Sequence, residues 1–299
     1  MSFLRLARIF LPVSLLLMAA SVVMLITPGL RLGIEFTGGT LMEFSLPEGK
    51  DRDALIAALD SFENENVSLE SATVSKTKTD SYFVRTESLT NEEHLALAAH
   101  VQKTLGEVKE LQFTTIGPTV GASLKNRALY ALIIAAIAII LYVAVAFRKV
   151  PRKLSPIRFG VIAVVALLHD IVITVGIFTV LSHVTTFQVD TLFVTALLSI
   201  MGYSVNDTIV IFDRIRDNLG LGEERHLSFA DLAEKSLKQT MTRTLNTGLG
   251  ALIMLFALFF LGSESIRWFI LTLIFGTVIG TYSSFFIATP LLVYWKKKD

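Results

Sequence analysis

One carboxylate lies inside an apolar segment that is long enough to cross a bilayer. The segment runs from Thr191 to Phe212, and Asp207 is its only acidic residue. An ionisable side chain at that depth costs several kcal/mol, so it is expected to have a partner, a bound proton or a function. Arg243, at the start of the next apolar segment, is the strongest candidate partner. The pattern predicts a membrane protein that uses an ion gradient.

The chemistry expected of this pair is a change of protonation. An arginine neighbour favours the ionised carboxylate, whereas burial favours the protonated one. Protonation of Asp207 would release Arg243 and let the helices shift. The alternative is a static salt bridge that fixes the register of the two helices. The adjacent Asn206 either takes part in ion coordination or hydrogen-bonds a neighbouring helix.

Two further ionisable residues, His169 and Asp170, lie near the centre of another apolar segment. Adjacent helical residues point about 100° apart, so these two need not share a partner. Both are candidate ion-coupling residues. No second histidine stands at ligand spacing, so no metal site is predicted. Asp213, Arg214 and Arg216 follow the Asp207 segment as a charged helix end, for which surface salt bridges are expected and docking to a partner is the alternative.

The composition places the chain among integral membrane proteins, because 53% of its residues are hydrophobic and only 18% are charged. The absence of cysteine excludes disulfides, thiolate nucleophiles and cysteine metal sites. The sequence shows no Ser/His dyad and no zinc motif, so no catalytic residue is assigned and an intramembrane enzyme ranks last. The balanced charge argues against nucleic-acid binding.

Six segments are long and apolar enough to span a bilayer. They are expected near Ala7–Thr27, Ala128–Phe147, Phe159–Leu181, Thr191–Phe212, Thr244–Leu261 and Trp268–Tyr294. The first is expected to be an uncleaved anchor rather than a signal peptide. The predicted organisation is a first transmembrane helix in 1–29, a soluble domain in 30–126, five more helices in 127–295 with a loop at 213–243, and a tail at 296–299.

Basic residues predict the orientation of the spans. They precede the first span, fill the link between the second and third, and follow the sixth. The residues are Arg5, Arg8, Arg148, Lys149, Arg152, Lys153, Arg158, Lys296, Lys297 and Lys298. Six spans bring all three groups to one side, which the positive-inside rule makes cytoplasmic. Both termini and the 213–243 loop are then cytoplasmic, and the domain at 30–126 is periplasmic.

The pattern of this extracytoplasmic domain is strand, helix, strand, strand, helix, strand. The segments are Thr40–Leu46, Asp51–Phe62 with Asp51 as cap, Val67–Val74, Tyr82–Thr86, Asn91–Leu105 with Asn91 as cap, and Glu110–Ile116. This order predicts a ferredoxin-like α+β domain. The fold class is therefore an α-helical membrane protein with six transmembrane helices and such a domain between the first two. A further amphipathic pattern at Gly220–Lys238 predicts an interfacial helix.

A glycine-containing stretch follows the first span: Gly33, Ile34, Glu35, Phe36, Thr37, Gly38, Gly39 and Thr40. Paired glycines permit backbone geometry that is closed to other residues. The stretch is interpreted either as a tight hinge between the membrane and the domain or as a contact with a second subunit.

Four motifs resemble those of the SecD/SecF family of protein-export membrane subunits, and specifically its SecF branch. They are GIEFTGGT at Gly33–Thr40, LHDIVIT at Leu168–Thr174, GYSVNDTIVIFDRIRDN at Gly202–Asn218 and TMTRTLNT at Thr240–Thr247. The third is the most specific, and the resemblance covers nearly the whole chain. Family members usually have aspartate where this chain has Glu35, an exchange that keeps the charge and lengthens the side chain.

The resemblance implies a partner, a channel and an energy source. The partner is SecD in a pseudo-symmetric unit of the resistance-nodulation-division superfamily, as a separate chain or fused to this one. The channel is SecYEG, the substrate is a preprotein, and the coupling ion is H+ or Na+. The family's intramembrane acid and arginine match Asp207 and Arg243. The alternative function is an exporter of small molecules or lipids from the same superfamily, which the small size of the domain disfavours.

Overall fold

The computed structural model describes residues 2–62, 69, 72–77, 79–148, 156–220 and 227–297. The chain divides into two compact units. Met1–Arg31, Tyr130–Phe187 and Thr191–Asp299 form a helical unit, and Leu32–Leu129 with Gln188–Asp190 forms an α/β unit.

The described residues contain six helical segments that are long and apolar enough to cross a membrane, which confirms the predicted number of spans. The first five are α1 (Phe3–Ile26), α5 (Pro118–Ala146), α6 (Pro156–Val184), α7 (Thr191–Gly220) and α8 (Phe229–Leu261). The sixth begins with a 3-10 turn (Glu264–Ile266) and continues as α9 (Arg267–Ser283), a π-helical turn (Ser284–Ala288) and α10 (Thr289–Lys297).

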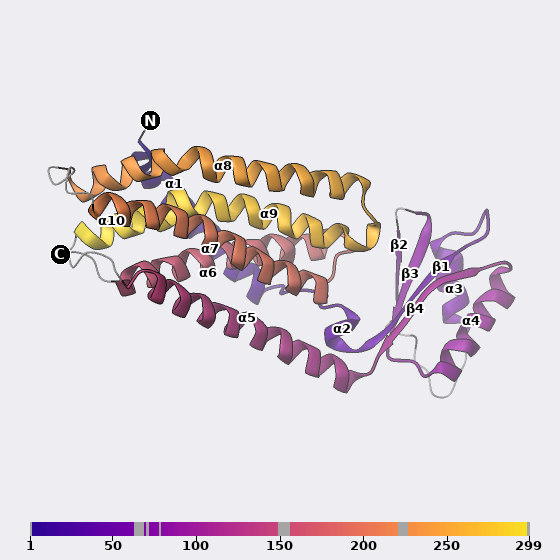
Figure 1. Ribbon diagram of the computed structural model, residues 1–299. Helices are drawn as coiled ribbons and strands as arrows, with labels where there is room; N and C mark the ends of the chain where they lie inside the picture. Colours follow the sequence, from indigo (N-terminus) through magenta and orange to yellow (C-terminus); the bar gives the residue numbers. More distant parts are fainter. Residues whose placement is uncertain are drawn as a thin grey trace. The chain divides into compact units, whose positions relative to one another are not determined.

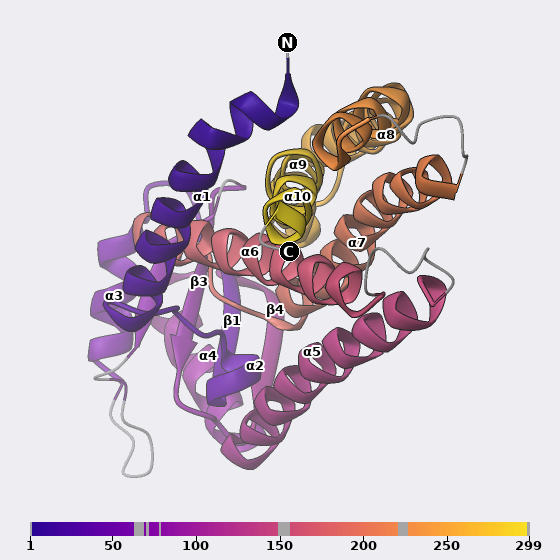
Figure 2. The ribbon, with the colours of Figure 1, turned by 90° about the vertical axis from the view of Figure 1, so that its left-hand side faces the viewer.

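Three spans form the centre of the helical unit. The buried share of the apolar window is 56, 50 and 56% in α6, α7 and the sixth span, against 11, 6 and 11% in α1, α5 and α8. Figure 2 looks along the helices and shows α9 and α10 between α1, α6, α7 and α8. The outer spans therefore present broad apolar faces to lipid or to another membrane protein, as a chain in a bilayer requires.

The α/β unit is a four-stranded antiparallel sheet with two helices on one face (Figure 1). Its elements are the short α2 (Ile34–Thr37), β1 (Gly39–Ser45), α3 (Arg52–Asp60), β2 (Thr73–Lys76), β3 (Ser81–Thr86), α4 (Asn91–Leu105) and β4 (Lys109–Ile116). The strand order β2-β3-β1-β4 confirms the predicted ferredoxin-like arrangement.

The core of this unit follows from two periodicities. Met42 and Phe44 are alternate residues of β1 and both are buried. Leu97, Val101 and Leu105 recur every four residues along α4 and meet them from the helical side. The strand and helix patterns therefore bury their apolar faces against one another.

Three local predictions are wrong. The strand expected at Val67–Val74 is β2, at Thr73–Lys76, and residues 63–68, 70 and 71 lie outside the described residues. The cap of α4 is Thr90 rather than Asn91, because Thr90 and Glu93 form a reciprocal capping box. Residues 229–238 are no separate interfacial helix but the first turns of α8; Leu232 and Leu237 are buried in the helical core.

Some of the predicted features lie outside the described residues. These are Lys149, Arg152 and Lys153 in the second link, Lys298 in the tail, and residues 221–226 of the amphipathic segment.

Candidate functional site

Helices α7 and α9 approach each other closely at two glycines. A Cβ atom added at Gly276 would overlap the Ile200 side chain, and one added at Gly280 would lie 3.0 Å from the Ser204 Cβ. The two glycines are one helical turn apart, as are Ile200 and Ser204. Small residues at this spacing allow membrane helices to pack in direct backbone contact. The hydroxyl-bearing residues that follow Gly280 on α9 are thereby brought against the polar face of α7.

Asp207 is buried on this face, with 2% of its surface exposed. Its Oδ2 accepts a hydrogen bond from the Thr281 Oγ1 of α9 at 3.2 Å. The expected ion pair with Arg243 is not formed: both residues belong to the described part of the chain, yet the Arg243 side chain is exposed. The buried residues of α8 at this level are Thr244 and Gly248. Arg243 precedes Thr244, so it points about 100° away from that buried face.

Two buried hydroxyls of α7 and α8 have unused hydrogen-bonding capacity. The Tyr203 OH and the Thr244 Oγ1 are buried and form no hydrogen bond among the described residues. A Cβ atom at Gly248 would lie 3.1 Å from the Tyr203 OH and 3.3 Å from the Thr281 Oγ1, so these two hydroxyls flank the same point of α8. Carboxylate and hydroxyl oxygens are the groups that bind a proton or a hard cation. Asn206, the neighbour of Asp207, is exposed and takes no part in this cluster.

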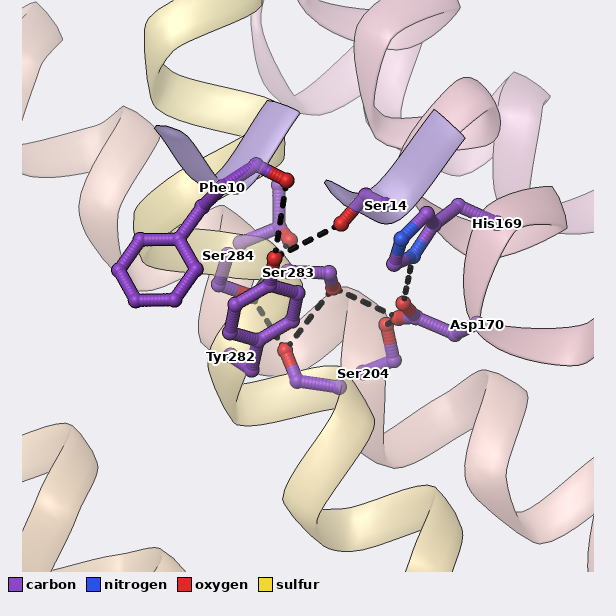
Figure 3. A network of polar contacts seen from close by, with 10 residues as sticks. Phe10, Ser14, His169, Asp170, Ser204, Tyr282, Ser283 and Ser284 are labelled. Carbon is purple, nitrogen blue, oxygen red and sulfur yellow. Dashed lines mark hydrogen bonds and ion pairs between the residues drawn. The ribbon is translucent and has the colours of Figure 1, made fainter. Parts of the chain in front are cut away.

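Asp170 is the second buried carboxylate among the described residues, and both of its oxygens have polar partners (Figure 3). Its Oδ1 lies 2.8 Å from the His169 Nδ1. Its Oδ2 accepts hydrogen bonds from the Ser204 Oγ of α7 and, at 2.8 Å, from the Ser283 Oγ of α9. Although His169 and Asp170 are adjacent on α6, the structure joins their side chains rather than directing them to separate partners.

Sequence reasoning missed the hydroxyl donors of both carboxylates. Ser204, Thr281 and Ser283 are not among the residues to which the sequence analysis gives a role. A signal was present, because Thr281, Tyr282, Ser283 and Ser284 are four consecutive hydroxyl residues within an apolar span. The π-helical turn starts at Ser284, whose Oγ lies 2.9 Å from the Thr208 Oγ1 of α7. Such turns often occur at functional sites.

The charged end of α7 forms contacts within the chain. Arg216 pairs with Asp213 at 2.6 Å, and the Arg214 Nε donates to the Gln239 Oε1 of α8 at 2.7 Å. The buried Asn218 donates to the same Gln239 oxygen at 2.9 Å. These contacts tie the ends of α7 and α8 together.

The paired glycines after the first span form a closely packed turn in the α/β unit. Gly38 and Gly39 have φ angles of +76° and +133°. A Cβ atom on Gly38 would lie 2.8 Å from the Pro118 Cα, and one on Gly39 would lie 2.7 Å from the Thr86 carbonyl oxygen. Both positions therefore require glycine for conformation and for space.

The rest of this stretch anchors the turn. The Gly33 N–H donates to the Val189 carbonyl at 2.8 Å, and the Thr37 Oγ1 donates to the Gly33 carbonyl at 3.1 Å. Phe36 is buried and Glu35 lies in the first turn of α2. Among the described residues, no group of three or more histidine or acidic side chains could hold a metal ion.

Two protein families match this chain. The family described as protein export membrane protein SecD/SecF, C-terminal, matches residues 96–298, and the SecD/SecF GG motif matches residues 23–46. The protein translocase subunit SecF of Thermobaculum terrenum is 39% identical over 97% of this chain and 92% of its own length. That of Desulfurispirillum indicum is 35% identical over 99% of this chain and 92% of its own length.

A solved structure shares the fold. The crystal structure of SecDF from Thermus thermophilus, described as a translocon-associated membrane protein, superposes with a TM-score of 0.84 and is 32% identical. The superposition covers 99% of this chain and 39% of the SecDF chain. This chain therefore corresponds to well under half of that larger protein.

Proposed function

This chain belongs to the SecD/SecF family of protein-export membrane proteins as a SecF-type translocase subunit, and from that premise we propose that it uses a proton or sodium gradient to drive a late stage of preprotein translocation. The membrane is the bacterial cytoplasmic membrane, and the partner is SecD acting beside the SecYEG channel. The termini and the 213–243 loop face the cytoplasm, and the domain at 30–126 faces the periplasm. Each proton that crosses the membrane contributes about 2.3 kcal/mol per 100 mV of potential.

The observation that carries the proposal is the condition of Asp207. The carboxylate is buried in a membrane-spanning helix and accepts one hydrogen bond from Thr281. The buried Tyr203 hydroxyl, which flanks Gly248 together with the Thr281 hydroxyl, has no hydrogen-bond partner among the described residues. A charge at this position is costly unless it is neutralised. Binding a proton or a sodium ion neutralises it, so ion binding and release change which arrangement of α7, α8 and α9 is stable.

The faces beside Asp207 support a companion subunit. Gly202 and Asn206 on α7 are exposed, and so are Arg243 and Gly250 on α8. A Cβ atom at either glycine would meet nothing within 4 Å. An arginine and an asparagine in membrane-spanning helices are poorly solvated by lipid tails, whereas a polar helix of another protein satisfies them. We propose that SecD binds over these exposed residues of α7 and α8. Arg243 then lies between the two subunits, where it contributes to the ion pathway.

The proposal is tested by translocation into inside-out membrane vesicles that contain SecYEG, SecD and this chain. A preprotein is arrested late in translocation, and its completion is measured under a proton gradient and then under a sodium gradient. We expect Asp207→Asn to remove the part of completion that depends on the coupling ion, because an amide binds neither ion as a carboxylate does. The ion whose gradient supports the wild type identifies the coupling ion.

The matched control is Asp217→Asn on the same helix. Asp217 is exposed and contacts Arg216 at 3.4 Å, so its loss leaves the buried cluster intact. Completion equal to wild type in Asp207→Asn would refute the coupling role. A defect in small-molecule efflux with normal preprotein export would instead favour the exporter alternative.

A further inference from the structure

The His169 imidazole is left with one unsatisfied nitrogen in the interior of the helical unit. His169 is 1% exposed, and its Nδ1 contacts the Asp170 Oδ1 at 2.8 Å. Its Nε2 is buried and has no hydrogen-bond partner among the described residues. A buried ring nitrogen without a partner is costly, and native structures rarely keep one without a reason.

The charge around Asp170 is also unbalanced. The Ser204 and Ser283 hydroxyls from α7 and α9 contact Asp170. The Tyr282 ring from α9 stacks on His169, and Ser14 from α1 hydrogen-bonds the Tyr282 hydroxyl. The other carboxylate on the neighbouring face of α7 is Asp207, and no lysine or arginine contacts Asp170 among the described residues. His169 is therefore the group in contact with Asp170 that can carry a positive charge.

We propose that His169 and Asp170 form a second proton-binding site inside the membrane, separate from Asp207. With Nδ1–H donated to Asp170, the lone pair of Nε2 accepts a proton from the aqueous phase. An N–H bond forms at Nε2, an O–H bond of the hydronium ion that supplies the proton breaks and leaves water, and the charge of the dyad changes from −1 to 0. Release of the proton reverses the step. A neutral pair is far cheaper to bury than an isolated carboxylate, so proton binding relieves the cost of burying Asp170.

Hydroxyl groups lie beside the ring that receives the proton. The Tyr282 ring stacks on the His169 imidazole with centroids 6.3 Å apart (Figure 3). The Tyr282 hydroxyl is held by the Ser14 Oγ at 2.7 Å and the Phe10 carbonyl at 3.3 Å, both on α1. These contacts fix the ring that covers the imidazole, and no hydroxyl of the described residues hydrogen-bonds the His169 Nε2.

The dyad is mechanically linked to Asp207 through shared helices. On α7, Ser204 contacts Asp170 and precedes Asp207 by about one turn. On α9, Ser283 donates to Asp170 while Thr281 donates to Asp207. A change of charge at the dyad changes the strength of the hydrogen bonds that Asp170 accepts from α7 and α9. The positions of these two helices, and with them the surroundings of Asp207, change as a result. This link rests on the proposed function of Asp207, whereas the proton site itself does not.

The proton site is tested by nitrogen-15 NMR of histidine-labelled chain reconstituted with SecD in lipid nanodiscs. The His169 signals are assigned by their loss in His169→Gln. We expect a neutral imidazole at high pH and a doubly protonated imidazolium as the pH falls. In Asp170→Asn the imidazolium loses its counter-charge, so His169 stays neutral over the range in which the wild type changes. A single neutral form of His169 at every pH, or an equal transition in Asp170→Asn, would overturn the proposal.

A second variant guards against misfolding of Asp170→Asn. Ser283→Ala removes one hydroxyl donor from Asp170 and keeps the dyad. Because the donor mainly stabilises the dyad of charge −1, its loss is expected to move the His169 transition to higher pH. A transition that does not move would contradict the proposed role of Asp170 as counter-charge. His183, on the same helix with its Nε2 2.8 Å from the Gly29 carbonyl, provides an internal reference in each sample.

The link to Asp207 has its own readout. Gradient-driven preprotein completion is measured across pH for His169→Gln and for the control His183→Gln. We expect the pH profile to change shape in His169→Gln and to keep its shape in His183→Gln. A uniform fall at all pH values would show a structural role and sink the link. If NMR shows the His169 transition while Asp207→Asn leaves coupling intact, the proton site stands and the proposed function fails.

Discussion

Asp170 and Asp207 are held by the same two helices, yet their carboxylates are satisfied to different degrees. Asp170 contacts His169 and accepts hydrogen bonds from Ser204 and Ser283. Asp207 accepts one, from Thr281, and the Tyr203 hydroxyl on the other side of Gly248 has no partner among the described residues. Both oxygens of the Asp170 carboxylate are therefore satisfied by this chain. The Asp207 carboxylate and the hydroxyl beside it keep hydrogen-bonding capacity that a bound ion or a partner protein can use.

The two carboxylates are satisfied to different degrees because a different helix joins α7 and α9 at each site: α6 at Asp170 and α8 at Asp207. At Asp170, α6 supplies the imidazole of His169 itself. Beside Asp207, α8 presents the bare backbone of Gly248 to the Tyr203 and Thr281 hydroxyls, and the Arg243 side chain is exposed. An enclosed carboxylate suits a proton, which needs no space, whereas one with unmet oxygens beside it also suits a larger cation.

The largest effect on translocation is expected from a substitution that disturbs both carboxylate sites at once. Gly280→Leu places a side chain where even a Cβ atom lies 3.0 Å from the Ser204 Cβ. Overpacking costs about 1–3 kcal/mol and here also separates α7 from α9, so gradient-driven translocation should be lost. Thermal unfolding in detergent and vesicle translocation measure the two consequences.

Gly250→Leu on α8 is the control for this prediction. A Cβ atom at Gly250 meets nothing within 4 Å in this chain, so the unfolding temperature of the isolated chain should not fall. Co-purification with SecD should fall instead, because the new side chain occupies the proposed SecD face. Equal destabilisation by both variants would mean that the α7–α9 contact does not organise the two sites.

The next largest effect is expected in the stability that is lost when each carboxylate is replaced by asparagine. Asp170→Asn removes a buried charge, but it weakens three contacts, with His169, Ser204 and Ser283, and each hydrogen bond to a charged group contributes about 1.5–3 kcal/mol, so a net loss of stability is expected. Asp207→Asn loses one hydrogen bond and also removes a buried charge, so its net effect on stability should be close to zero. Unfolding of the two variants under identical detergent conditions compares them. If Asp207→Asn proved the more destabilising, the contrast drawn between the two sites would be wrong.

The sequence predicts the spans and the α/β unit well because hydropathy and periodicity are local properties. It fails where packing decides. The amphipathic residues Leu232 and Leu237 looked suited to a membrane surface, but they pack in the helical core and extend α8 by fifteen residues toward its start at Phe229, ahead of the predicted start at Thr244. Periodicity identified an apolar face without identifying what covers it.

The same limit applies to the candidate sites. Asp170 and Asp207 are visible in the sequence because a carboxylate in an apolar span is rare. Their donors are not, since a helical serine or threonine commonly bonds its own backbone, as Thr179 does with the Val175 carbonyl. The depth of Arg243 could be predicted from its position along α8. Its direction could not, because that depends on which face of α8 packs on α7.

The donors allow a finer test of the contrast. Thr281→Val removes the hydrogen bond to Asp207 without changing the shape of the side chain. About 1.5 kcal/mol lost at the coupling carboxylate corresponds to about a tenfold fall in gradient-driven rate. Ser283→Ala leaves Asp170 in contact with His169 and Ser204, so at neutral pH its rate should stay within about twofold of wild type. The two variants are compared by their translocation rates at one fixed gradient. A slower rate in Ser283→Ala than in Thr281→Val would assign the coupling step to Asp170.

The smallest effect is expected at the hydroxyl pair that touches neither carboxylate. The Ser284 Oγ lies 2.9 Å from the Thr208 Oγ1 and donates to the Gly280 carbonyl at 3.0 Å. Ser284→Ala should lower stability by about 0.5–1.5 kcal/mol, the contribution of a neutral hydrogen bond, and leave the response to the coupling ion unchanged. Unfolding and translocation measured on the same preparation separate the two quantities. A changed ion response would mean that proton or cation binding extends to the π-helical turn, and that Asp170 and Asp207 belong to one continuous polar pathway.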